Sequence, residues 1–168
     1  MCFGTSFFVL FLQLLFSGAV LAQQGDDSRS TAFCDFTDGQ EVSVRYSNAP
    51  ISSKDEPRSG KVWTPNGVPM TLFSATTLVL AKSEIPPGAY SVYVIPNRKD
   101  WTFIVNKNVT AGAAYDEKND IARGSMELGE VDSPPKQLQV SFAHTSPKVC
   151  SIRLYYGKEG AFIDLGEK

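Results

Sequence analysis

The chain has 168 residues, with 16 Lys and Arg against 18 Asp and Glu, for a formal net charge of −2. This balance leaves no excess of positive charge for nucleic acid or anionic lipid, so neither is expected as a partner. His144 is the only histidine, and a zinc site wants several His or Cys ligands. A Ser-His-Asp triad would have to use His144, and no Gly-x-Ser-x-Gly elbow occurs in the sequence. No phosphate loop or dinucleotide fingerprint occurs, so we expect no cofactor, metal or catalytic residue.

Residues 7–22 form an apolar run that ends in small residues and is followed by a polar stretch. This layout is typical of a secretory signal peptide, here residues 1–22 with cleavage after Ala22. The alternative is an uncleaved N-terminal anchor. The run is shorter than the about 20 apolar residues of a membrane helix, and Gln13 interrupts it. We therefore expect a periplasmic or extracellular protein without a membrane segment after cleavage.

Two cysteines remain after removal of the signal, Cys34 and Cys150. An even number of cysteines in an oxidising compartment favours a disulfide, and this pair would close most of the chain. The alternative is two buried free thiols.

The remaining chain favours strands over helices. Residues 23–31 are polar and predict a disordered tail. Apolar residues then alternate with a period of two, which predicts strands over residues 41–46, 71–81, 89–95, 101–105, 121–128, 137–143, 150–156 and 161–165. Pro and Gly mark the turns between them. The pattern predicts an all-β fold, a single antiparallel β-sandwich over residues 32–168, jelly-roll-like or a partly open barrel.

Two features locate the strands and the binding loops within this fold. Residues 89–95 are apolar on both faces, which predicts a central strand. Residues 137–142 alternate polar and apolar, so one face of that strand meets water. The long loops 48–60 and 106–119 are where binding residues are expected, because loops on a rigid scaffold commonly carry function.

Several short segments match a known family in order and spacing. They are Tyr46-Ser47 with Pro50, Gly60-Lys61-Val62-Trp63, Pro87-Gly88-Ala89-Tyr90-Ser91, Ile95-Pro96, Trp101-Thr102-Phe103-Ile104-Val105-Asn106-Lys107, and Tyr115-Asp116 with Asp120 and Arg123. The region of residues 42–123 thereby resembles DUF2911, a bacterial exported family with no assigned reaction. The resemblance implies a secreted or periplasmic β-rich domain.

The chain departs from this family after Trp63. Family members typically continue with Arg-Thr-Gly-Ala-Asn, whereas Thr64-Pro65-Asn66-Gly67 follows here. If that Arg and Asn form a polar site in the relatives, the site is lost or rebuilt in this chain.

The loops around Lys61 and Trp63 and around residues 115–123 are the candidate ligand-binding site. Its residues are Lys61, Trp63, Tyr115, Asp116, Asp120 and Arg123. The acidic segment 116–120 is an alternative calcium site, since its oxygens are of the type calcium binds. It is otherwise a solvated loop in which Asp120 caps the turn and Asp116 pairs with Arg123.

Aromatic residues are a second set of candidates for ligand binding. On an exposed face they would form a carbohydrate platform, and otherwise they belong to the core. The set is Trp63, Tyr90, Tyr93, Trp101, Phe103, Tyr155 and Tyr156. Trp63 is the one expected to be exposed, because it lies where a polar loop meets a turn.

These patterns favour a non-catalytic binding or interaction module of the cell envelope. Its partner is a small molecule, a glycan or an envelope protein. One alternative is a polysaccharide hydrolase that pairs Asp116 or Asp120 with Glu127 or Glu130, since glycosidases use two facing carboxylates. Another is a purely structural envelope component.

Overall fold

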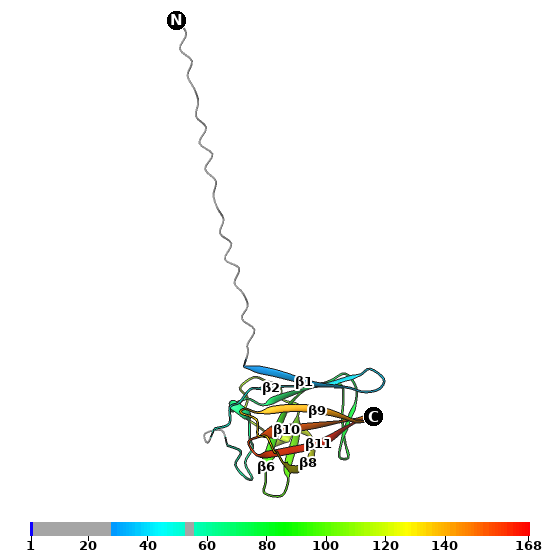
Figure 1. The fold of residues 1–168 in the computed structure, drawn as a ribbon. Helices are drawn as coiled ribbons and strands as arrows, with labels where there is room; N and C mark the ends of the chain where they lie inside the picture. Colours follow the sequence, from blue (N-terminus) through cyan, green and yellow to red (C-terminus); the bar gives the residue numbers. More distant parts are fainter. Residues whose placement is uncertain (2–27, 53–55) are drawn as a thin grey trace.

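The computed structural model describes residues 1, 28–52 and 56–168. Apart from Met1, the expected signal peptide lies outside these residues. The described part consists of antiparallel strands and two short 3-10 turns, η1 (Pro65–Gly67) and η2 (Glu117–Asn119) (Figure 1). The strands are β1 (Arg29–Asp35), β2 (Glu41–Ser47), β3 (Met70–Ser74), β4 (Leu78–Leu80), β5 (Ser83–Ile85), β6 (Gly88–Pro96), β7 (Trp101–Asn106), β8 (Asp120–Glu130), β9 (Gln139–Ser146), β10 (Val149–Tyr156) and β11 (Glu159–Glu167).

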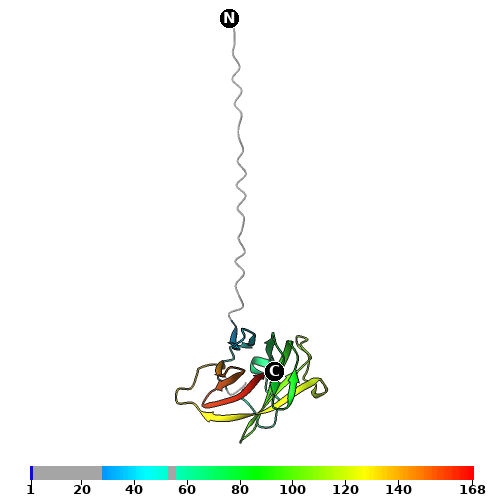
Figure 2. The same ribbon diagram turned by 90° about the vertical axis from the view of Figure 1, so that its right-hand side faces the viewer.

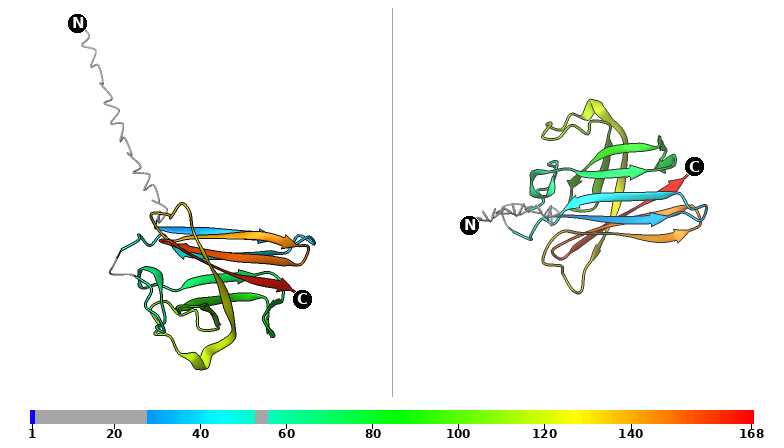
Figure 3. Two further views of the ribbon diagram at one scale, coloured as in Figure 1. Left: turned by 60° about the horizontal axis from the view of Figure 1, so that its bottom comes forward. Right: turned by 90° about the horizontal axis from the view of Figure 1, so that it is seen from above.

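The strands form one sheet that curls into a nearly closed barrel. Their order is β1-β2-β3-β6-β7-β8-β11-β10-β9, and β4 joins β5 to the end of β11. The long strand β8 pairs first with β7 and then, from Glu127 onward, with β11, so it carries the sheet around the corner (Figure 2). The two ends, β1 and β9, return to lie side by side (Figure 3). The structure confirms the expected all-β architecture.

Hydrogen bonds at both ends help to close the seam between β1 and β9. Beyond β1, the Thr37 N–H donates to the Pro147 carbonyl at 3.1 Å. At the opposite end, the Leu138 N–H donates to the Ala49 carbonyl at 2.7 Å. These bonds satisfy main-chain groups that an open sheet would leave exposed.

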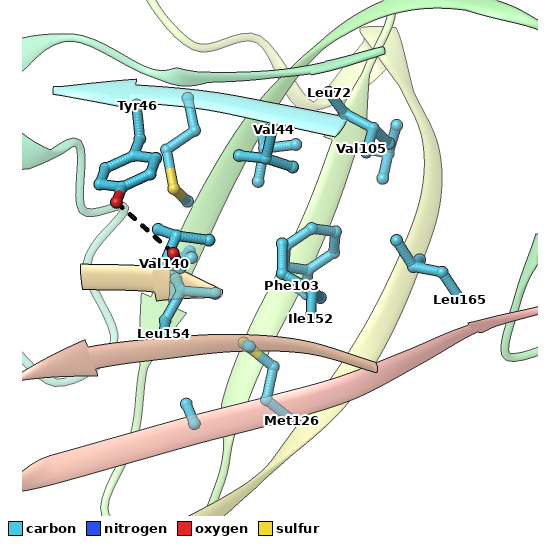
Figure 4. Close-up of a cluster of buried hydrophobic side chains, with 14 of the residues drawn as sticks. Val44, Tyr46, Leu72, Phe103, Val105, Met126, Val140, Ile152, Leu154 and Leu165 are labelled. Atoms are coloured by element: carbon cyan, nitrogen blue, oxygen red, sulfur yellow. Dashed lines mark hydrogen bonds between the residues drawn. The ribbon is translucent and has the colours of Figure 1, made fainter. Parts of the chain in front are cut away.

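A disulfide and a buried tyrosine cross the same seam. Cys34 of β1 is bonded to Cys150 of β10, which confirms the expected bridge. The hydroxyl of Tyr46 donates to the Val140 carbonyl at 3.4 Å, joining β2 to β9 inside the core (Figure 4). β1 and β9 share no strand ladder, and the disulfide holds this side of the barrel together covalently.

The core fills the barrel with side chains that alternate along each strand. In β6, the expected central strand, Val92 and Val94 are at most 1% exposed, and β3 and β7 flank it. The largest fully buried side chains of this core include Trp101, Phe103, Met70, Leu72, Met126, Ile152 and Leu154. Burial of this apolar surface is the main stabilising contribution to the fold.

Several strand boundaries differ from the sequence prediction, and β5 was not predicted; two of the differences have a clear structural cause. Residues 71–81 form two strands, because β3 ends in a turn where the Ser74 hydroxyl donates to the Thr76 carbonyl at 2.7 Å. The polar residues 29–31, expected to belong to a disordered tail, begin β1, where Arg29 is the register partner of Ser47. The ladder to β2 stabilises this edge strand, and that partner is not apparent from local sequence.

Candidate functional site

The predicted polar residues near position 120 meet at the junction of β7 and β8. Asn106 ends β7, Asp120 begins β8, and the two are register partners. The register shifts between Val105 and Asn106, so that Ile121 is skipped and a β-bulge results. Because bulges redirect side chains, this one helps to gather four residues, here named the Asp120 cluster: Asn106, Tyr115, Asp120 and Arg123.

Asp120 is the centre of this cluster. Its Oδ1 accepts a hydrogen bond from Nδ2 of Asn106 at 2.7 Å. Its Oδ2 accepts from the Tyr115 hydroxyl at 2.7 Å and from Nε of Arg123 at 2.8 Å. The Asp120 side chain is only 9% exposed. With both oxygens engaged by the protein, this carboxylate fastens residues 107–119 to the barrel.

The pKa values of Arg123 and Tyr115 are both raised within the cluster. The hydrogen bond to Asp120 is the main cause that raises the pKa of Arg123. Burial, followed by the hydrogen bond to Asp120, raises the pKa of Tyr115 to about 12. The Tyr115 hydroxyl, which also accepts from Nη2 of Arg123 at 2.7 Å, stays protonated well above neutral pH.

The cluster also covers a second apolar layer outside the barrel. Tyr93, Ile104 and Arg123 are register partners on β6, β7 and β8. Ile104 is 0% exposed although it alternates with the core residues Phe103 and Val105. The ring of Tyr115 packs edge-on against that of Tyr93, with centroids 4.8 Å apart. The connection between β7 and β8 is therefore packed down on the sheet.

Asp116 and Asp120 have exchanged the roles expected of them. Asp116 caps η2 by accepting from the Lys118 N–H at 3.1 Å, while Asp120 pairs with Arg123. The solvated-loop alternative assigned the two roles the other way round, because spacing alone cannot tell which carboxylate points toward the sheet. Within residues 28–52 and 56–168, no group of three or more His, Cys, Asp or Glu side chains is arranged to hold a metal.

Trp63 is buried, and the expectation of exposure is wrong. Its exposed fraction is 6%, and its main-chain N–H donates to the Val94 carbonyl at 2.7 Å. Its ring makes edge contacts with Trp101 and Tyr156, at centroid distances of 5.9 and 5.0 Å. The bridge to β6 draws the ring into the core although polar residues precede it.

Lys61 lies away from the Asp120 cluster. The preceding residue, Gly60, donates its N–H to Pro96 at the last position of β6. Asn106 instead pairs with Ser91, near the beginning of that strand. The structure thus brings together Tyr115, Asp116, Asp120 and Arg123, and it leaves Lys61 and Trp63 at the other end of β6.

A groove on the outer face of β8, β10 and β11 was not identified from the sequence. Its first hollow has a volume of about 300 Å³ and is lined in part by Gly129, Glu130, Arg153, Tyr155, Gly160 and Phe162. Gly129 and Gly160 are register partners, so these two positions add no side chain to the floor. We call this hollow and its continuation the β8–β11 groove.

The groove continues past Phe162 into a second hollow of about 400 Å³. Gly124, Ser125, Glu127, Phe162, Ile163 and Asp164 are among its lining residues. It opens where β8 and β11 are no longer paired, on the N-terminal side of Glu127 in β8. Phe162, which is 38% exposed, therefore stands between the two hollows.

The aromatic set divides between core and surface. Trp63, Tyr93, Trp101, Phe103 and Tyr156 are buried, whereas Tyr90 and Tyr155 are half-buried. Tyr155 borders the groove, together with Phe162, which the sequence did not single out. Alternation along residues 160–164 would have placed Gly160, Phe162 and Asp164 on one face, but only strand pairing places Gly129 and Arg153 beside them.

Comparisons with known proteins place the chain in a family. Among the described residues, no helix is long and apolar enough to span a membrane. None of the curated proteins and none of the solved structures matches the chain significantly. A family described as "Protein of unknown function (DUF2911)" matches residues 29–164. This match extends over the barrel from β1 into β11, and the chain belongs to the DUF2911 family.

Proposed function

We propose that this protein is an exported, non-catalytic binding module whose ligand lies in the β8–β11 groove. The observation that carries the proposal is the groove itself, two adjoining hollows of about 300 and 400 Å³ with Phe162 between them. Hollows of this size are in the range that small-molecule sites occupy. An aromatic side chain that is 38% exposed beside such hollows is available for ligand contact.

A supporting role for the Asp120 cluster agrees with this assignment. Catalysis by Asp120 requires a carboxylate oxygen that can reach a substrate proton or carbon. Both oxygens of Asp120 already accept hydrogen bonds from Asn106, Tyr115 and Arg123. We assign Tyr115, Asp120 and Arg123 to holding the β7–β8 connection, with the exposed part of Arg123 as a secondary contact surface.

Export is supported by the sequence and by the bridge. The apolar run of residues 7–22, with the small residues at its end, has the pattern of a secretory signal. The Cys34–Cys150 disulfide is of the kind that persists in oxidising compartments.

The test is a melting-temperature panel on the chain from Gln23 to Lys168. The probes are oligosaccharides, short peptides and divalent metals. A ligand at 100 times its Kd adds about 2.7 kcal/mol, which raises the melting temperature by several degrees. Gly129→Leu should abolish the shift, because nothing lies within 4 Å of a Cβ built at Gly129 and the added side chain fills the groove.

The matched control is Ala89→Leu, which adds the same apolar bulk at an exposed position on β6. It should leave the ligand shift intact. A shift that survives Gly129→Leu would place the site elsewhere and overturn the proposal. Chemical conversion of a bound probe would overturn its non-catalytic part.

A further inference from the structure

Building on this proposed function, we infer that the β8–β11 groove binds a short linear oligosaccharide that carries an amino sugar. The juxtaposition behind this inference is an exposed phenyl ring, Phe162, with a carboxylate on one side and a guanidinium on the other. Glu127 and Arg153 are the direct register partners of Phe162 on β8 and β10. The three residues form one row across the outer face of the sheet.

This row offers the two kinds of contact that a sugar ring needs. The C–H face of a pyranose packs on a flat aromatic ring, which buries area at low entropic cost. Its equatorial hydroxyls point outward from the ring edge, toward groups that donate or accept hydrogen bonds. Arg153 supplies donors and Glu127 supplies acceptors on either side of Phe162.

The length of the groove fits about two or three sugar units. Gly160 and Asp164, on the outer face of β11, line opposite ends and are four residues apart. With a rise of about 3.3 Å per residue, this separation is about 13 Å. Tyr155 borders the first end, where a Cβ at Gly160 would lie 3.2 Å from its ring.

The charges differ between the two hollows and select the type of sugar. The second hollow is lined by Glu127 and Asp164 and by no Lys or Arg among its described residues. The Ser125 hydroxyl there donates to Asp100 at 2.6 Å, which brings a third carboxylate close by. Opposite charges attract and like charges repel, so this end accepts an ammonium group and rejects a uronate or sulfate.

The position of the first hollow within the sheet argues against a peptide that adds a strand to β11 there. Peptides that add a strand need an open sheet edge with unpaired N–H and C=O groups. Along the first hollow, β11 is paired on both sides, with β8 through Gly129 and Gly160 and with β10 through Gly160 and Tyr155. Along this part of β11, recognition therefore comes from side chains, as it does for a glycan.

The experiment is calorimetric titration with three trimers of matched length: β-1,4-linked glucosamine, β-1,4-linked glucose and α-1,4-linked galacturonate. We expect glucosamine trimer to bind tightest and galacturonate trimer not to bind. Phe162→Ala should weaken binding at least about tenfold, as for a central aromatic anchor. Phe73→Ala is the matched control, since Phe73 is 41% exposed on the outer face of β3, away from the groove.

The carboxylates are tested by charge removal at constant shape. Glu127→Gln with Asp164→Asn should reduce the preference for glucosamine over glucose trimer to about one, with little change in glucose binding. A preference that survives this double change would overturn the charge assignment. Equal losses from Phe162→Ala and Phe73→Ala would overturn the placement of the sugar on the Phe162 ring.

These experiments distinguish a wrong ligand class from a wrong binding site. The three trimers could fail to bind while another probe gives a melting-temperature shift that Gly129→Leu abolishes. The groove would then still be the binding site, and the amino-sugar inference would be wrong. If every probe shift is insensitive to Gly129→Leu, the proposed function fails as well.

Discussion

Asn106 donates a hydrogen bond to Asp120 at 2.7 Å, joining the last residue of β7 to the first residue of β8. The same Nδ2 atom also donates to the Asp116 carbonyl at 3.0 Å. Asn106 is 1% exposed, so a single buried amide ties the C-terminal end of the connection to the sheet. The connection between β7 and β8 is thereby fixed by polar contacts on its inner side.

Asp120→Asn should lower the free energy of unfolding by about 1–3 kcal/mol, because it replaces an acceptor of charged hydrogen bonds. Asp116→Asn should change it by less than about 0.5 kcal/mol, since an amide oxygen can still cap η2. Urea unfolding of the two variants measures both values. Equal losses from the two variants would contradict the assigned roles.

Tyr115 should make stability fall with pH on the alkaline side. Its folded pKa is about 12, against 10.0 as the ordinary value, so the unfolded chain loses this proton first. The contribution is fully present below pH 10 and is lost as the pH rises toward 12. Unfolding at pH 9 and pH 11 should show a smaller decrease for Tyr115→Phe than for the wild type. An identical decrease in both would contradict this role.

Replacing both Cys34 and Cys150 by Ser should remove much of the stability. The bridged residues are 116 positions apart, and a loop of this length contributes at most about 4–5 kcal/mol through chain entropy. Urea unfolding with and without reductant measures the loss. The reductant should destabilise the wild type and leave the double variant unchanged, and hydrogen exchange in β1 should accelerate before that in β6.

Two glycines of β8 should respond differently to alanine. A Cβ at Gly124 would overlap Cδ1 of Ile163 and would lie 3.0 Å from Cδ1 of Leu80. Gly124→Ala should therefore lower the free energy of unfolding by about 1–3 kcal/mol, because the added methyl group overpacks the core. Gly129→Ala has nothing within 4 Å and should be neutral or slightly stabilising. Thermal unfolding compares the two, and similar melting temperatures would argue against the close packing of β8 on β11.

Trp63→Ala should lower the free energy of unfolding by about 3–5 kcal/mol. The ring is 6% exposed and contacts Trp101 and Tyr156, so its removal leaves a cavity in the core. Lys61→Ala, at an exposed position two residues earlier, should change stability by less than about 0.5 kcal/mol. A Trp63→Ala variant as stable as the wild type would contradict the buried position.

More of the Asp120 cluster than of the β8–β11 groove can be predicted from the sequence. Four of the expected site residues, Tyr115, Asp116, Asp120 and Arg123, lie close in sequence and stay close in the fold. Asn106 was missed as their partner because a buried amide has no distinctive local pattern. The groove was missed because its walls come from three strands.

The sequence by itself determined the strand content, the family and the pair of cysteines available for a bridge. Alternation of apolar residues is a local property, and a chain segment carries it whether or not its partner strand is present. Only the tertiary structure decided that Trp63 points inward, that Asp120 rather than Asp116 meets Arg123, and that Phe162 stands between Glu127 and Arg153. These relationships depend on register between distant strands, where a shift of one residue turns every side chain to the opposite face.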